Sequence, residues 1–223
     1  MTICIIPARF NSKRIKEKNI KFIKGKPLIG HVIQKLKKAK IFSRIIVSTD
    51  NLKIAKISKK FGAEVPFLRS KKLSDDYTPT YKVLVDCVKK IKSQNDEFHF
   101  CVYPTSIFIN KNDLKKAFTK IKKTKSNCLV TIKKFEPSPL RSLKIRKNNI
   151  FFSNPKYQIS RSQDLQNLFY DTGSFYIYKT KSLLNLTTDK SLPNKTTYLI
   201  LKNNVIDINN TSDLKAAKKL FKR

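Results

Sequence analysis

Two hydrophobic patterns alternate along the chain. Short runs rich in β-branched and aromatic residues predict strands at 2–7, 44–50, 64–69, 98–104, 127–135, 173–178 and 197–208. Stretches with apolar residues on one helical face predict helices at 27–40, 51–63, 78–94, 110–125 and 211–223. Strands that alternate with amphipathic helices are typical of the α/β class, so we expect a mostly parallel sheet with helices on both faces.

Polar residues mark where two of the expected helices begin. Thr78 or Thr80 precedes the apolar face of the helix at 78–94 and is expected to cap it. Thr211 or Ser212 is expected to cap the last helix, which carries an acid in its first turn and bases in its last turn.

The alternation breaks between about Glu136 and Asp171. This stretch contains prolines, short aromatic runs and little helical periodicity. Long irregular excursions of this kind usually carry function or form an interface, so we expect an arm inserted at about 136–171. The length of 223 residues fits one compact domain, and we therefore expect residues 1–223 to form a single domain that carries this arm.

The formal net charge of +34 would ordinarily suggest a nucleic-acid partner. The excess is mostly lysine, however, and it is spread through every expected helix. The sequence has no separate basic helix and no platform of aromatic residues with arginines of the kind that single-strand binders use. We therefore expect no specific nucleic-acid partner, and we keep salt-sensitive, non-enzymatic polyanion binding as an alternative function.

Cysteine and histidine offer little to a metal or nucleophilic site. The four cysteines are far apart in sequence and lack the close spacing of a zinc site, so we expect buried thiols in a reducing compartment at Cys4, Cys87, Cys101 and Cys128. The two histidines, His31 and His99, are expected to be structural.

No stretch approaches the roughly 20 apolar residues that span a bilayer. The N-terminal apolar run is too short for a secretory signal, and no basic region precedes it. We therefore expect a cytoplasmic protein without a membrane partner.

Polar clusters follow four of the expected strands. They lie at 9–19, 48–50, 103–106 and 207–213. Ligands of open α/β sheets bind beyond the carboxyl ends of the strands, where such clusters come together. Turns and helix caps also favour these residue types, so it is their convergence on one edge that favours a functional site.

The first of these clusters contains no glycine, although phosphate-binding loops usually depend on glycine. Four cations, Arg9, Lys13, Arg14 and Lys18, instead follow one strand, and together they can neutralise a diphosphate or triphosphate. Asn11 is expected to adopt the left-handed conformation that a glycine would otherwise supply. The sequence therefore predicts a phosphate site built from side chains.

Seven segments, in order, give the chain its likeness to a known family: "IIPARFNSKRIKEKNI", "GKPLI", "IVSTD", "AEVPFLRSKKLSDDYTPT", "YPTS", "RSQDLQNLFYDTGSFYIY" and "VIDINNTSDLKAA". They span almost the whole chain, which resembles the CMP-sugar-acid synthetases, the cytidylyltransferases that activate sialic and other nonulosonic acids. "EVPFLR" paired with "RSQDL" is most similar to the pseudaminic acid cytidylyltransferases. The alternatives are enzymes for 3-deoxy-manno-octulosonate (Kdo), legionaminic acid or other sialic acids.

The resemblance implies a Rossmann-like nucleotidyltransferase fold and a reaction that joins CMP from CTP to an acidic nine-carbon sugar. Pyrophosphate would leave, and Mg²⁺ would be the cofactor. The resemblance also implies a homodimer, in which the inserted arm is the dimerisation arm and carries sugar-binding residues towards the partner subunit's site.

The family's functional residues carry over onto matching positions of this chain. Contacts to CTP are implied for Pro7, Ala8, Arg9, Asn11, Ser12, Lys13, Lys18, Asn19, Ser74 and Asp75, and the stretch from Ser74 to Asp76 is implied to lie near the nucleotide or the sugar. Catalytic roles are implied for Lys13, Arg14 and Asp207. Contacts to the sugar are implied for Tyr103, Thr105, Ser106, Arg161, Gln163, Asp171 and Gly173. Ligation of Mg²⁺ is implied for Asp207 and Asn209.

The chain departs from the family pattern at three places. Phe10 and Asn11 replace the usual pair of glycines in the first loop. Tyr103 replaces a sugar-binding glutamine, which argues against the common sialic acid as substrate. Asn209 replaces the second aspartate after Asp207, so the expected metal site has one carboxylate fewer and is expected either to bind Mg²⁺ more weakly or to use Asp213 or another acid.

Overall fold

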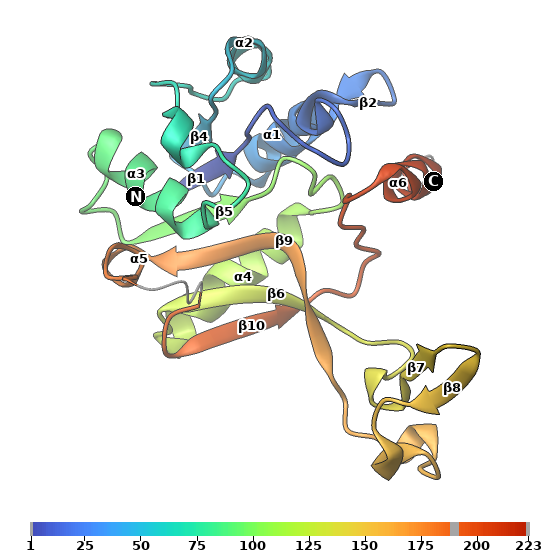
Figure 1. Ribbon diagram of the computed structural model, residues 1–223. Helices are drawn as coiled ribbons and strands as arrows, with labels where there is room; N and C mark the ends of the chain where they lie inside the picture. Colours follow the sequence, from blue (N-terminus) through green and yellow to red (C-terminus); the bar gives the residue numbers. More distant parts are fainter. Residues whose placement is uncertain (1, 188–191, 222–223) are drawn as a thin grey trace.

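The computed structural model describes residues 2–187 and 192–221, and Figure 1 shows their arrangement. Within these residues, the main sheet has the strand order β10-β6-β9-β5-β1-β4. The strands are β1 (Thr2–Pro7), β4 (Arg44–Ser48), β5 (Phe98–Val102), β6 (Cys128–Lys134), β9 (Phe169–Lys179) and β10 (Thr196–Ile200). Strand β1 therefore lies between β4 and β5, where the carboxyl ends of three strands are adjacent.

Most neighbouring strands run in the same direction. Strand β1 is parallel to β4 and to β5, and β10 is parallel to β6. Strand β9 is antiparallel to both of its neighbours, β5 and β6. The mostly parallel sheet expected from the alternating pattern is confirmed, with β9 as its antiparallel member.

Helices cover both faces of the sheet. They are α1 (Leu28–Ala39), α2 (Leu52–Lys60), α3 (Thr80–Lys90), α4 (Lys111–Thr124), α5 (Thr180–Leu184) and α6 (Thr211–Leu220). Successive side chains of a strand point to opposite faces, so Cys4 and Ile6 of β1 pack in the core that includes α1 and α4. Ile3 and Ile5 pack in the other core, with α3 and α5.

Two of the predicted strands differ most from the expectation. Residues 64–69 pair with the sheet through isolated bridges at Glu64 and Leu68, because Pro66 lies between them and has no N–H to continue the ladder. Strand β10 ends at Ile200, so the prediction of a strand over 197–208 was wrong beyond that point. Residues 201–208 instead carry the chain to the edge of the sheet without regular structure.

Both predicted helix caps were also wrong. Helix α3 follows Pro79, and no side chain of the described residues caps it there; the Thr80 hydroxyl instead lies 3.0 Å from the Tyr103 hydroxyl. Helix α6 is capped one residue earlier than expected, by Asn210, whose side chain accepts from the N–H of Asp213. The Asp213 carboxylate accepts in return from the N–H of Asn210, which completes a capping box.

The inserted arm comprises residues 135–168 and projects away from the sheet (Figure 1). It contains the hairpin β7 (Leu143–Arg146) and β8 (Asn149–Phe152) and the short turns η3 (Pro139–Arg141), η4 (Pro155–Tyr157) and η5 (Ser162–Asp164). Residues 169–171, which the pattern assigned to the arm, already belong to β9. The remaining elements are η1 (Lys18–Ile20), β2 (Phe22–Ile23), β3 (Lys26–Pro27) and η2 (Lys71–Leu73).

The cysteines and histidines have the structural roles expected of them. All four thiols are buried and unpaired. His99 lies between the hydroxyls of Ser93 and Thr180, and burial lowers its pKa to about 4. The Nε2 atom of His31 lies 2.7 Å from the carbonyl oxygen of Ile23. Among the described residues, no helix has the length and apolarity that crossing a membrane requires.

Candidate active site

A cavity of about 520 Å³ lies at the carboxyl ends of β1 and β5, where two of the four polar clusters, those at 9–19 and 103–106, come together. It takes side chains from the loop after β1, from the segment between η2 and α3, and from the segment after β5. The expected site residues that line it are Pro7, Arg9, Ser12, Lys13, Arg14, Lys18, Asn19, Asp75, Tyr103 and Thr105. One cavity thus brings together most of the nucleotide contacts implied by the resemblance.

The other three implied nucleotide contacts, Ala8, Asn11 and Ser74, do not line this cavity. Ala8 is buried beneath the first loop, and its N–H donates to the carbonyl oxygen of Ser48. The Ser74 hydroxyl donates to the carbonyl oxygen of Ser70 and accepts from Nε of Arg69. Asn11 is exposed.

The first loop, residues 9–19 after β1, is held in place by contacts with distant parts of the chain. Its Phe10 N–H donates to Asp50 at the end of β4, and the Asn19 side chain donates to the carbonyl oxygen of Arg9. Asn11 was expected to be left-handed, and this was wrong: Glu17 has that conformation, with φ 54°. Glu17 also forms an ion pair of 2.8 Å with Lys53 of α2.

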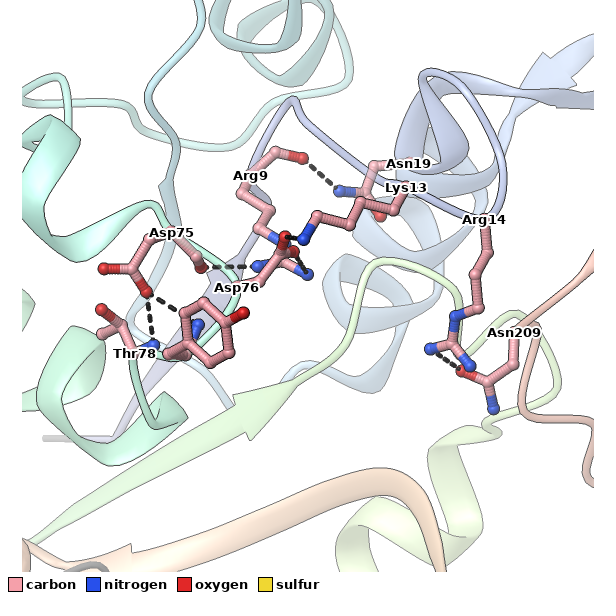
Figure 2. Close-up of polar contacts among 9 residues, drawn as sticks. Arg9, Lys13, Arg14, Asn19, Asp75, Asp76, Thr78 and Asn209 are labelled. Carbon is pink, nitrogen blue, oxygen red and sulfur yellow. Dashed lines mark hydrogen bonds and ion pairs between the residues drawn. The ribbon is translucent and has the colours of Figure 1, made fainter.

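Two of the loop's cations share one carboxylate (Figure 2). One guanidinium nitrogen of Arg9 lies 2.8 Å from Oδ1 of Asp76, and Nζ of Lys13 lies 2.7 Å from Oδ2. The hydrogen bond from Lys13 and the charge of Arg9 lower the pKa of Asp76. The Asp75 carboxylate accepts from the N–H groups of Tyr77 and Thr78, and hydrogen bonds from Thr78 lower its pKa.

The other two cations connect the first loop to the segment before α6. Arg14 donates to Oδ1 of Asn209 at 2.8 Å, and Lys18 donates to the carbonyl oxygen of Ile208 at 2.7 Å. Burial lowers the pKa of Lys18, and the nearby charge of Asp207 opposes that shift. Through these two bonds, the implied metal residues lie at the same edge of the sheet as the first loop.

The residues around Asp207 suit Mg²⁺ only with few protein ligands. Among the described residues, no group of three or more His, Cys, Asp and Glu side chains could hold a metal ion. Asp207 is exposed. Gly173 lies beside it, because a Cβ built on this glycine would be 3.8 Å from the Asp207 carboxylate, an ordinary van der Waals contact. Asn209 donates to Asp207 at 2.6 Å, while its own oxygen accepts from Arg14. One carboxylate fits Mg²⁺, which keeps several waters and takes phosphate oxygens as further ligands.

Most of the implied sugar contacts lie in or beside the main cavity. Tyr103 and Thr105 line the main cavity, and burial raises the pKa of the Tyr103 hydroxyl. Thr105, Gly173 and Asp207 line a small adjoining cavity. Ser106 also borders this cavity, and its hydroxyl donates to the carbonyl oxygen of Ser174.

Asp171 is close to these residues, whereas the last two implied contacts are not. The Asp171 carboxylate accepts from the Tyr176 hydroxyl and from the N–H of Gly173. Arg161 and Gln163 lie in the projecting arm, where Arg161 pairs with Asp164 at 3.0 Å. The single chain therefore does not bring these two residues to the cavity.

Several further lining residues were not identified from the sequence, among them Arg69, Thr78 and Thr80. Arg69 is 5% exposed, and Thr78 and Thr80 lie at the start of α3. A single arginine in so basic a chain reads as a surface charge, and the threonines read as helix caps. Only the tertiary structure shows that Arg69 is a buried cation in the cavity wall.

The chain matches known proteins over nearly its whole length. The family profile described as Cytidylyltransferase matches residues 3–219. The chain is 36% identical over 223 residues to the pseudaminic acid cytidylyltransferase of Campylobacter jejuni subsp. jejuni serotype O:23/36. The alignment covers 99% of this chain and 96% of the relative. It is 29% identical over 227 residues to the CMP-N,N'-diacetyllegionaminic acid synthase of Legionella pneumophila subsp. pneumophila, with 98% and 95% covered.

A solved structure shares the fold. It is that of a CMP:2-keto-3-deoxy-manno-octonic acid synthetase complexed with CTP, with a TM-score of 0.73 at 15% sequence identity, covering 99% of this chain and 98% of the other. The nucleotidyltransferase fold expected from the motifs is thereby confirmed. Because the family profile and a relative of 36% identity both span nearly the whole chain, this chain is a member of the cytidylyltransferase family.

Proposed function

We propose that this protein transfers CMP from CTP to pseudaminic acid, forming a CMP-sugar and pyrophosphate. The observation that carries the proposal is the full-length likeness to a pseudaminic acid cytidylyltransferase, together with a cavity lined by the cations of the first loop. The anomeric hydroxyl of the sugar attacks the α-phosphate of CTP, and the bond to the β-phosphate breaks as pyrophosphate leaves. The unpaired thiols and the CTP donor favour a cytoplasmic location.

Arg9, Lys13 and Arg14 are proposed to hold the triphosphate. Nucleotidyl transfer depends mainly on alignment and on stabilisation of charge at the phosphate oxygens and the leaving group. Arg9 and Lys13 already point to one position in the cavity, at Asp76, and Arg14 contacts Asn209 (Figure 2). These cations would stabilise the negative charge that develops on the departing pyrophosphate.

Asp207 is proposed to hold Mg²⁺, with the Asn209 amide as a neighbour rather than a charged ligand. When bound, Mg²⁺ polarises phosphate oxygens and lowers the pKa of a coordinated hydroxyl. Asn209 donates to Asp207 and accepts from Arg14, so it orients the carboxylate and the guanidinium relative to each other. Such a site obtains most of its ligands from the nucleotide and from water.

The arm is proposed to form a homodimer and to bring Arg161 and Gln163 to the partner subunit's cavity. Several large apolar side chains of the arm are exposed, among them Ile145 at 76% and Ile150 at 63%. These two residues lie opposite each other in the β7–β8 hairpin, so they form one apolar surface. Contiguous exposed apolar surface of this kind marks an interaction site.

The experiment is a pyrophosphate-release assay with CTP and Mg²⁺ and a panel of acids. We expect turnover with pseudaminic acid, and weaker or no turnover with legionaminic acid, N-acetylneuraminic acid and Kdo. Equal turnover with Kdo would contradict the proposed acceptor. No turnover with any acid, combined with CTP binding that disappears at high salt, would favour the alternative of a non-enzymatic polyanion binder.

A further inference from the structure

The Asp76 side chain lies at the centre of the proposed phosphate site. Its two carboxylate oxygens are 2.8 Å from a guanidinium nitrogen of Arg9 and 2.7 Å from Nζ of Lys13 (Figure 2). A phosphate group that presented two oxygens would make the same pair of contacts. Asp76 therefore occupies, within the protein's own structure, the position where a polyphosphate would meet these two cations.

The segment that carries Asp76 is held over the cavity by the same loop. The Asp75 carbonyl oxygen accepts from a second guanidinium nitrogen of Arg9, and the Asp75 carboxylate organises the turn through the N–H groups of Tyr77 and Thr78. This segment lies between η2, which ends at Leu73, and α3, which begins at Thr80. The contacts to the first loop come from the Asp76 side chain, one backbone oxygen and the Tyr77 ring, whose centroid is 5.9 Å from Nζ of Lys13, so they can be exchanged without unfolding a helix or strand.

The two ion pairs are exposed enough to exchange. The Asp76 side chain is 28% exposed, and that of Lys13 is 74% exposed. Ion pairs in such surroundings contribute little net stability, because water solvates the separated charges well. A single carboxylate with one negative charge is therefore a weak competitor for a triphosphate, which carries several.

We propose that Asp76 is an exchangeable counter-ion that CTP displaces and that weakens the binding of the pyrophosphate product. This inference rests on the proposed function, because it assumes that Arg9 and Lys13 receive the phosphates. CTP gains further contacts through its base and ribose, which compensate for the broken ion pairs, whereas pyrophosphate has none. As pyrophosphate leaves, the Asp76 carboxylate returns to both cations. Asp76 thus competes with both ligands for the same two cations, and pyrophosphate, which lacks the base and ribose contacts, is left with the weaker binding.

The test is Asp76→Asn, which removes the charge and keeps the shape of the side chain. Dissociation constants for CTP, pyrophosphate and cytidine are measured by calorimetry without a divalent cation. We expect CTP and pyrophosphate to bind about three- to tenfold more tightly, because two exposed ion pairs no longer compete, and cytidine to bind as before. Pyrophosphate should also become a stronger product inhibitor in the assay.

A matched control is Glu64→Gln, which removes one negative charge from an ion pair with Arg44 elsewhere on the surface. It should leave all three dissociation constants unchanged, so that a general increase in positive charge is excluded as the cause. Asp76→Ser serves as a second variant, and melting temperatures verify that both variants are folded.

Weaker or unchanged binding of CTP and pyrophosphate to Asp76→Asn would overturn the inference, because the carboxylate would then orient the cations rather than compete for them. Lys13→Ala in the same titration separates this failure from failure of the proposed function. If Lys13→Ala weakens CTP binding, the nucleotide site stands whatever Asp76 does. If Lys13→Ala leaves CTP binding unchanged, the proposed nucleotide site itself is wrong.

Discussion

The edge of the sheet and the projecting arm differ in which residues their charged and apolar side chains contact. At the edge, Arg9 and Lys13 contact Asp76, and Arg14 contacts Asn209, although these residues come from three separate segments. In the arm, Arg161 pairs with Asp164, three residues away on the same turn. The edge is thus assembled by tertiary contacts within one chain, whereas the arm's charged contact is local.

The apolar side chains differ in the same sense. Those beneath the site, such as Ile6 and Val47, are fully buried in the core between the sheet and its helices. Those of the hairpin, such as Ile145 and Ile150, are largely exposed. Exposed apolar surface forgoes the free energy of burial, roughly 25 cal/mol for each Å². This contrast is the basis of the proposal that one chain completes the nucleotide half of the site and that the arm packs against a second chain.

Replacement of Lys13 is expected to have the largest effect. Lys13→Ala removes a cation that would stabilise the leaving group, so kcat/KM for CTP should fall by about a hundredfold or more. Lys16→Ala, an exposed lysine of the same loop, is the matched control and should retain activity. Steady-state pyrophosphate release measures the effect, and circular dichroism checks the fold. Full activity of Lys13→Ala would show that Lys13 does not stabilise the leaving group at the edge of the sheet.

Disruption of the hairpin surface should have the next largest effect. The double replacement Ile145→Asp and Ile150→Asp places two charges opposite each other on the proposed interface, so the dimer should dissociate and activity should fall by about tenfold or more. Light scattering measures the mass. Ile200→Asp, on the edge strand β10 and 44% exposed, is the control outside the arm. A double variant with the same mass as the wild type would show that the arm does not hold two chains together.

Arg161→Ala tests which subunit the arm serves. We expect the KM for the sugar to rise by about tenfold through loss of a contact to its carboxylate, while CTP binds as before. Mixed dimers of Lys13→Ala and Arg161→Ala chains should regain activity at low sugar concentration, because one site per dimer then combines both intact residues. Failure of the mixture to regain activity would place both residues in the same subunit's site.

Asn209→Asp is expected to have the smallest effect. A second carboxylate beside Asp207 adds charge to the proposed metal site, so the Mg²⁺ concentration for half-maximal activity should fall by about threefold. Titration with Mg²⁺ at saturating CTP measures this value. Asn112→Asp, which adds one carboxylate at an exposed position of α4, is the matched control and should leave this value unchanged. An unchanged Mg²⁺ dependence would place the metal away from residue 209.

Local patterns predicted the elements well where a pattern had no competitor. The strand expected at 2–7 is β1, because an uninterrupted β-branched run between two parallel neighbours has one way to bury both faces. The strand expected at 64–69 failed because Pro66 interrupts the ladder. The caps failed because several polar residues stand near each helix start, and the choice of Asn210 depends on its reciprocal bond with Asp213.

The sequence by itself determined the α/β class, the cationic loop after the first strand and the family to which the chain belongs, since these follow from periodicity and from residues close together in the chain. Tertiary structure decided which side chains meet. Asp76 lies between Arg9 and Lys13, and Arg14 meets Asn209 across 195 residues of sequence. The buried position of Arg69 was likewise hidden among many basic residues. Contacts of such long separation depend on how the sheet brings loop ends together, and no local pattern encodes that distance.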